Sequence, residues 1–339
     1  MIKYNNSKIN NWYISDDNII KVYFNNDVCY HQLKGISQDY QVQYFTIRSL
    51  ADNNTINLYN NMSATTTNFS YSLDSGTTWT DFTLPKQTNQ TIATLASGST
   101  VMLKGTNNTL GDTYNSGHYF RASEDYTIEG AITSLVNGDN INLEIGDSED
   151  RSYTFAQLFS GDTHLINAED LVIRSIALPD GAFNCTFRSC TSLVAAPELP
   201  STNLGADTYG STFEGCTSLA KPPKELRFTS VRSDRIYTRM FTMSRTSRVQ
   251  AAMTETPKLF GDWGNLNPKN EQMFCGNANL NKVYCYWTKA NHNFDGYNTN
   301  WMNYTTGGGT FYKRSTESFS RNVSGVPTGW TLTNDDVTV

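Results

Sequence analysis

A seven-residue motif that occurs twice constrains the fold of this chain more than any other feature. Residues 187–193 read FRSCTSL, and residues 213–219 read FEGCTSL, 26 positions later. Related frames begin at Phe159 and Phe274, with a degenerate copy at Phe241, so the intervals between the five phenylalanines are 28, 26, 28 and 33 residues. Repeats on this scale are typical of solenoids, in which each coil buries its apolar side by stacking on its neighbours.

The two cysteines of this motif could form a chemical site or lie in a core ladder. A nucleophilic cysteine needs a His or Asp close by, and the motif contains neither. The six cysteines include no C-x-x-C pair and the four histidines are scattered, so zinc ligation has no supporting spacing. A free thiol is small and apolar, and we therefore expect both cysteines in the core, with no metal and no cofactor. The predicted ladder consists of Phe159, Phe187, Cys190, Leu193, Phe213, Cys216, Leu219, Phe274 and Leu280.

The rest of the chain is also predicted to be mainly β. Residues 36–126 contain about seven short β-prone segments separated by turn residues, which fits an immunoglobulin-like β-sandwich. Near the N-terminus, IIKVYF (19–24) and VCYHQL (28–33) flank a turn-forming Asn-Asn-Asp sequence and predict a hairpin. The predicted divisions are an N-terminal segment (1–35), a sandwich (36–126), a solenoid (127–280) and a C-terminal cap (281–339).

Composition excludes several classes of function. Charged residues make up 17% of the chain and the net charge is -6, so no general field attracts nucleic acid or an anionic membrane. No run of 18 apolar residues occurs, which argues against membrane insertion. The N-terminus lacks an apolar run of signal-peptide length, and we therefore expect synthesis in the cytoplasm without export by the general route.

The repeats resemble those of BspA-like leucine-rich-repeat proteins of gut Bacteroidetes and of the phages that infect these bacteria. The resemblance lies in F-x-G-C-T-S-L followed by AAPELP (195–200), and it extends to NLNKVYCYWTKA (279–290) and SGVPTGWTL (324–332), which are similar to the closing segment of such arrays. Upstream, TLASGSTVMLKG (94–105) is similar to the sandwich that often precedes these repeats. Residues 1–35 resemble the N-terminal segment of structural proteins of phages, including crAss-like phages.

These resemblances imply a non-enzymatic virion protein, a head or tail fibre or decoration protein. Residues 1–35 would attach it to other capsid or tail proteins, and the repeats would adhere to a protein or glycan of the host surface. The implied location is the virion, after synthesis in the host cytoplasm, and a homodimer or homotrimer is compatible with it. The alternatives are an exported bacterial cell-surface adhesin and a carbohydrate-active enzyme.

Two stretches are candidates for a binding surface. Residues 227–249 carry six arginines against one aspartate, which is typical of a solvated face or of a docking surface for an acidic protein or glycan, because guanidinium groups bind carboxylates in a bidentate manner. Residues 287–314 are rich in aromatic and Asn residues, which suits either a cap on the solenoid or a carbohydrate contact. The candidate contacts are Arg232, Arg235, Arg239, Tyr297, Trp301 and Tyr304.

Residues 72–79, SLDSGTTW, fit the Asp-box pattern S-x-D-x-G-x-T-W. We expect a structural hairpin turn here, in which Asp74 bonds the backbone, Gly76 adopts a positive φ and Trp79 packs beneath. A glycosidase would need two carboxylates placed across a cleft, and the acidic stretches at 147–150 and 169–170 single out no such pair. Clustered oxygen ligands in GDSED (146–150) could suit calcium, but the spacing is not that of an EF-hand.

Overall fold

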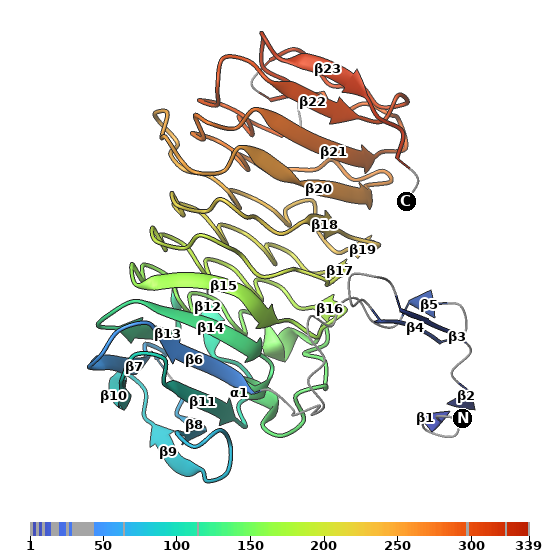
Figure 1. The fold of residues 1–339 in the computed structure, drawn as a ribbon. Helices are drawn as coiled ribbons and strands as arrows, with labels where there is room; N and C mark the ends of the chain where they lie inside the picture. The colour runs from blue at the N-terminus through green and yellow to red at the C-terminus, as the bar shows by residue number, and fades with distance from the viewer. Residues whose placement is uncertain are drawn as a thin grey trace. The chain divides into compact units, whose positions relative to one another are not determined.

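The computed structural model describes residues 44–337 except 64, 114, 296, 297 and 323, and, nearer the N-terminus, the backbone of residues 3–4, 7–8, 11–14, 20–24 and 27–28. The chain divides into two compact units, Met1–Val42 and Gln43–Val339. The described residues are mainly β, as the sequence predicts (Figure 1).

The described residues of the first unit form five short strands. β1 (Lys3–Tyr4) pairs antiparallel with β2 (Ser7–Lys8), and a second antiparallel sheet has the order β3 (Asn11–Ile14), β4 (Ile20–Phe24), β5 (Asp27–Val28). The predicted hairpin is confirmed near its turn, because Phe24 lies opposite Asp27 and Tyr23 opposite Val28. Residues 29–35, and Cys29 among them, lie outside the described residues.

The second unit begins with two sheets. Its strands are β6 (Phe45–Ser49), β7 (Asn54–Asn60), β8 (Thr67–Ser72), β9 (Thr80–Leu84), β10 (Thr88–Leu95), β11 (Thr100–Gly105), β12 (Gly111–Thr113), β13 (Ser116–Ala122), β14 (Tyr126–Ala131) and β15 (Leu165–Val172). One sheet has the order β15-β14-β6-β11-β8-β9 and the other β10-β7-β13-β12. The ring centroids of Phe45 on β6 and Phe120 on β13 are 5.4 Å apart, so the two sheets face each other across a shared core. Strands β6–β11 and β13 overlap the seven predicted β-prone segments, which are residues 40–50, 55–61, 68–75, 77–84, 90–95, 99–105 and 118–123.

The six-stranded sheet crosses residue 126, where the sequence places a domain boundary. β14 starts at Tyr126, pairs antiparallel with β6 on one side, and pairs parallel with β15 on the other. A short helix α1 (Ser134–Asn137) and a 3-10 turn (Glu149–Arg151) lie between β14 and β15 in the chain. The change from antiparallel to parallel pairing therefore occurs within one sheet and not between two domains.

From β15 onward the chain forms a stack of coils (Figure 1). The remaining strands are β16 (Ala177–Leu178), β17 (Asn203–Leu204), β18 (Glu225–Arg227), β19 (Ser230–Val231), β20 (Glu255–Asp262), β21 (Lys282–Thr288), β22 (Thr310–Lys313) and β23 (Thr331–Asn334). They form two parallel sheets, β16-β17-β19 and β18-β20-β21-β22-β23. The parallel sheet thus continues through residues 281–334, in the region that the sequence assigns to a cap.

The opposite side of each coil consists of turns with a regular backbone pattern. Every second backbone amide of these turns donates a hydrogen bond to a carbonyl of the next coil. Phe155 N donates to Ala182 O, and Phe159 N donates to Thr186 O, both at 2.8 Å. One position of this pattern is left-handed in six successive coils, with φ between +54° and +63°. The six residues are Gln157, Cys185, Ser211, Arg239, Gln272 and Asn300. The backbone therefore repeats even where the side chains do not.

Candidate binding surfaces

The phenylalanines of the repeat form a continuous buried column. Ring centroids are 5.4 Å apart for Phe159 with Phe187 and for Phe187 with Phe213, and the column continues through Phe241 to Phe274 at 5.5 and 5.7 Å. Neighbouring rings are within 13° of parallel. All nine residues of the predicted ladder are fully buried. Their contacts are with other coils, which leaves them no surface for a ligand.

The motif cysteines bind the preceding coil. Cys190 Sγ donates to the carbonyl of Phe159 at 3.1 Å, and Cys216 Sγ donates to that of Phe187 at 2.9 Å. Burial raises the pKa of Cys190 well above its ordinary value and that of Cys216 to about 12. Because the thiolate is the reactive form, both thiols are unreactive at neutral pH. Cys185, Cys275 and Cys285 are buried and free as well.

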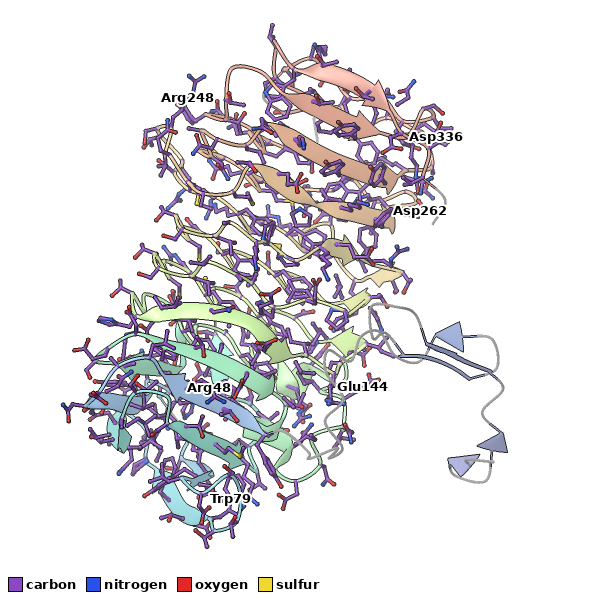
Figure 2. All side chains as sticks on the ribbon, viewed as in Figure 1. Arg48, Trp79, Glu144, Arg248, Asp262 and Asp336 are labelled. Carbon is purple, nitrogen blue, oxygen red and sulfur yellow. The ribbon has the colours of Figure 1, made fainter. Side chains whose placement is uncertain are left out.

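The arginines of residues 227–249 do not form an open basic surface, because acidic residues, mostly of other coils, neutralise most of them. The ion pairs are Arg227 with Glu225 (3.3 Å), Arg232 with Asp180 (3.5 Å), Arg235 with Glu271 (3.9 Å) and Arg245 with Glu214 (3.9 Å). Arg239 Nε donates to Gln272 Oε1 at 3.2 Å. Arg248 is exposed. In Figure 2 it lies at one edge of the coils, and Asp262 lies at the other edge. Exposed ion pairs of this kind each contribute little to the free energy of folding. Because most of these arginines have an acidic partner, we describe this face as charge-balanced and solvated.

The predicted aromatic contacts are separated by the structure. Trp301 is fully buried, 6.0 Å from both Phe274 and Trp287, and its Nε1 donates to the carbonyl of Gly325. Trp301 follows Phe274 by 27 residues and occupies the ladder position of the next coil, so it cannot contact a ligand. Tyr304 is 39% exposed, and Tyr297 lies outside the described residues.

The Asp-box forms the turn between β8 and β9. Asp74 Oδ1 accepts from Thr78 N at 2.8 Å and Oδ2 accepts from Thr78 Oγ1 at 2.6 Å, and these bonds lower the pKa of Asp74 to about 2. Gly76 has φ +86°, and Trp79 Nε1 donates to its carbonyl at 3.1 Å. The predicted structural turn is confirmed, and Ser72, Asp74, Thr77, Thr78 and Trp79 all form hydrogen bonds within it.

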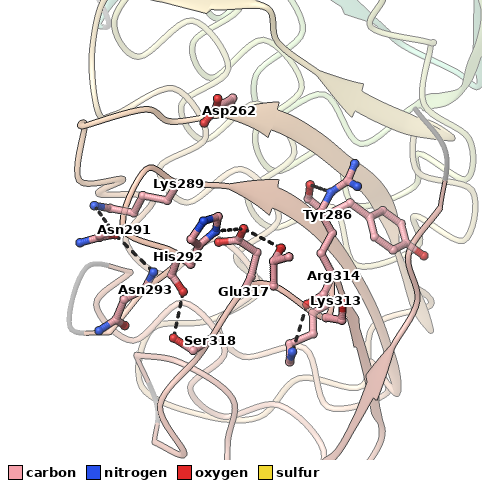
Figure 3. Close-up of polar contacts among 12 residues, drawn as sticks. Asp262, Tyr286, Lys289, Asn291, His292, Asn293, Lys313, Arg314, Glu317 and Ser318 are labelled. Atoms are coloured by element: carbon pink, nitrogen blue, oxygen red, sulfur yellow. Dashed lines mark hydrogen bonds and ion pairs between the residues drawn. The ribbon is translucent and has the colours of Figure 1, made fainter.

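A histidine and a buried glutamate form a pair that the sequence did not reveal (Figure 3). His292 Nδ1 lies 2.8 Å from Glu317 Oε1, with the imidazole 59% exposed and the carboxylate side chain fully buried. Thr316 Oγ1 also donates to Oε1 at 3.1 Å, and Ser318 Oγ donates to the carbonyl of His292 at 2.9 Å. These bonds join segments 25 residues apart on neighbouring coils, so the pair ties the last coils together.

The acidic stretches considered for glycosidase or calcium chemistry are dispersed. Asp150 bonds Ser148 and Asn108, and Glu169 lies 3.5 Å from Lys221. In the part of the chain that the structure describes, no three His, Cys, Asp or Glu residues are placed to hold a metal ion. Among the same residues no helix is long and apolar enough to cross a membrane.

Among the described residues, two grooves are considered as candidate ligand sites. The larger, about 500 Å³, lies on β8, β9 and β11 and is lined by Asn68, Ser70, Asp81, Thr83, Lys104 and Asp139 among others. The smaller, about 340 Å³, lies on β20 and β21 and is lined by Arg227, Phe260, Asp262, Tyr286 and Arg314 among others. Small-ligand sites typically occupy about 300–1,000 Å³. The only sequence signal for the larger groove was the alternation of polar residues in residues 67–72 and 80–84. The pairing of these residues across strands is not visible in the sequence.

Comparison with protein-family models, curated proteins and solved structures finds no match for this chain. The function proposed below therefore rests on the residues, on their geometry and on the resemblance of the repeats to those of BspA-like proteins.

Proposed function

We propose that this chain is a non-enzymatic structural protein of a phage virion, a head or tail fibre or decoration protein. Residues 1–35 attach it to the particle. The remaining chain, an immunoglobulin-like sandwich followed by a BspA-like leucine-rich-repeat solenoid, adheres to a protein or glycan of the host surface.

One observation favours a role in displaying a binding surface over a role in catalysis. The side chains that could take part in catalysis instead hold the fold together. Cys190 and Cys216 bond the preceding coil, and Asp74 holds a turn. The described residues assemble no nucleophile with an adjacent base among these motifs, and the arginines are largely paired within the chain.

The stacked coils support the solenoid assignment. Parallel strands pair on one side of each coil, and the phenylalanine column runs through the interior. Solenoids of this kind bind through extended surfaces. Weak contacts become effective when many copies act together on one particle, because the second and later contacts are intramolecular.

The grouping of Met1–Val42 as a compact unit of its own supports a distinct attachment segment. The test is quantitative mass spectrometry of gradient-purified phage particles beside the host-cell envelope fraction. We expect the chain in particles at a fixed ratio to the major capsid protein. Absence from particles would overturn the proposal, and enrichment in the envelope fraction of uninfected cells would support the exported bacterial adhesin instead.

A further inference from the structure

The geometry points to a binding site for a neutral saccharide in the larger groove, on the outward face of β8, β9 and β11. This inference rests on the proposed adhesive function. It names the ligand class and places the contact on the sandwich, away from the arginines and C-terminal aromatic residues that the sequence suggested.

The floor of this groove is a row of hydrogen-bonding side chains in cross-strand register. Asp81 lies opposite Ser70, and Ser70 opposite Lys104. Ser70 Oγ donates to Asp81 Oδ1 at 2.6 Å, and Lys104 Nζ donates to Asp139 Oδ1 at 2.8 Å. A carboxylate can accept several hydrogen bonds at once, and the ammonium group of Lys104 has three N–H donors, so the row presents acceptors beside a donor. Adjacent hydroxyl groups of a sugar ring, which both donate and accept, match this pattern.

A second row of polar side chains lies beside the first. Thr83 Oγ1 donates to Asn68 Oδ1 at 2.9 Å on the neighbouring register position. Phe82 alternates with these residues along β9 and packs its ring on Phe69 on the core side, so it supports the groove from beneath. Asn68, Asp81 and Thr83 are exposed, so a ligand can reach both rows of polar groups.

The wall beside Lys104 is fixed before any ligand arrives. Lys104 Nζ lies 4.2 Å from the ring centroid of Trp79 and 5.5 Å from that of Tyr44, and the Tyr44 hydroxyl donates to Asp139 Oδ1 at 2.7 Å. Burial, together with Asp139, raises the pKa of Tyr44 to about 12, so the hydroxyl remains a donor at physiological pH. Preorganised groups lose less conformational freedom on binding.

Charge selects a neutral ligand over an acidic one. Lys104 is the cation among the named lining residues, and Asp139 already neutralises it at 2.8 Å. The carboxylate of Asp81 is exposed and has a hydroxyl, not a cation, as its partner. An acidic sugar would therefore meet an unfavourable like charge.

The smaller groove fits a saccharide less well, because its aromatic faces are covered. The guanidinium of Arg227 lies 4.5 Å from the Phe260 ring centroid. Tyr286 is 1% exposed, and its hydroxyl donates to Asp335 Oδ2 at 2.6 Å. This groove therefore supplies a control site for the experiment.

The experiment screens the full chain against immobilised neutral oligosaccharides of glucose, galactose, mannose and N-acetylglucosamine, with sialyllactose and an oligogalacturonate as acidic probes, and measures hits by calorimetry. We expect at least one neutral oligosaccharide to bind. Affinity should fall at least tenfold in Asp81→Ala, which removes an acceptor, and in Thr83→Trp, which fills the groove. Asp262→Ala, in the smaller groove, should leave affinity unchanged.

Asp81 and Thr83 are exposed, so both variants are expected to fold, and a urea unfolding curve checks this. The inference is overturned if no neutral oligosaccharide binds, if acidic probes bind instead, or if both groove variants keep wild-type affinity. If host cells still bind the wild-type chain in any of these cases, the proposed adhesive function stands and only its placement in this groove is wrong.

Discussion

The position three residues after each ladder phenylalanine is not occupied by the same residue in every coil, and the neighbouring contacts explain part of the choice. In the first coil it is Asp162, whose carboxylate accepts from the Tyr126 hydroxyl at 2.9 Å and from His164 N at 2.8 Å. Burial raises the pKa of Asp162. In the next two coils the position is cysteine, whose thiol reaches only a carbonyl. The carboxylate of Asp162 thus faces a hydroxyl donor from β14, whereas the thiols of Cys190 and Cys216 each face a carbonyl of the preceding coil.

Cys216→Ala should destabilise the protein and leave binding intact. The change removes a fully buried sulfur and its bond to the Phe187 carbonyl, and we expect a loss of about 1–2 kcal/mol in the free energy of unfolding. Urea unfolding measures this. The control is Cys185→Ala, whose Sγ bonds the adjacent Asn184 side chain, and which should lose less because Cys185 is less completely buried. An unchanged midpoint in Cys216→Ala, or loss of binding in a folded variant, would contradict the structural assignment of the motif.

His118 should make the protein sensitive to acid. Its ring is fully buried, Nδ1 donates to the Leu110 carbonyl and Nε2 accepts from Thr67 Oγ1, and burial lowers its pKa to about 4. In the unfolded chain the pKa is about 6.5. The neutral ring therefore contributes stability that is complete above about pH 6.5 and is lost as the pH falls towards 4. We expect a loss on the order of 3 kcal/mol across this window.

Urea unfolding at pH 7, 6, 5 and 4 tests this expectation. His118→Gln should be less stable at pH 7 and should lose less on acidification than the wild type. His164→Gln, at a partly exposed histidine, serves as the substitution control. Equal slopes for wild type and His118→Gln would show that other groups cause the acid sensitivity.

At the scale of elements, the substitution of a glycine between two coils should show how closely the coils are stacked. Gly276 has φ +81°, and a Cβ there would lie 2.3 Å from the carbonyl oxygen of Ser244 in the preceding coil. Gly264 is also left-handed, at φ +52°, but a Cβ there would meet nothing within 4 Å. We expect Gly276→Ala to cost about 2–4 kcal/mol in the free energy of unfolding and Gly264→Ala about 1 kcal/mol. Equal losses would mean that the coils are not packed this closely.

Elements governed by local pattern could be predicted from the sequence. The seven strand segments were visible as short β-prone runs, and the β8–β9 turn was visible in the Asp-box. The ladder was visible because Phe and Cys recur at fixed places. Trp301 was misassigned because its coil replaces the ladder phenylalanine with tryptophan, which hides the frame.

Features that depend on register between distant segments could not be predicted. The acid that pairs with Arg232 is Asp180, which is 52 residues away in the chain. The sheet that crosses residue 126 depends on the pairing of β14 with β15, and the groove on β8, β9 and β11 depends on cross-strand register. A single sequence contains no signal for these pairings.

At the scale of the whole molecule, the second unit has one continuous core. The Phe159 ring of the first coil lies 5.7 Å from Phe120 and 6.1 Å from Phe45, so the ladder begins inside the two-sheet region. The carbonyl of Leu158 accepts from Phe120 N at 2.8 Å. The sheets therefore cover the first coil, whose apolar side would otherwise be open to water. This continuity is consistent with the grouping of Gln43–Val339 as one unit.

The proposed function requires that the chain displays residues 43–339 from a particle to which its N-terminal segment is attached. Antibody labelling of intact phage particles, observed by electron microscopy, tests it most directly. An antibody against folded residues 43–339 should decorate intact particles, whereas one against residues 1–35 should bind only after the particles are disrupted. Particles that bind neither antibody before or after disruption, or intact particles that bind only the antibody against residues 1–35, would contradict the account.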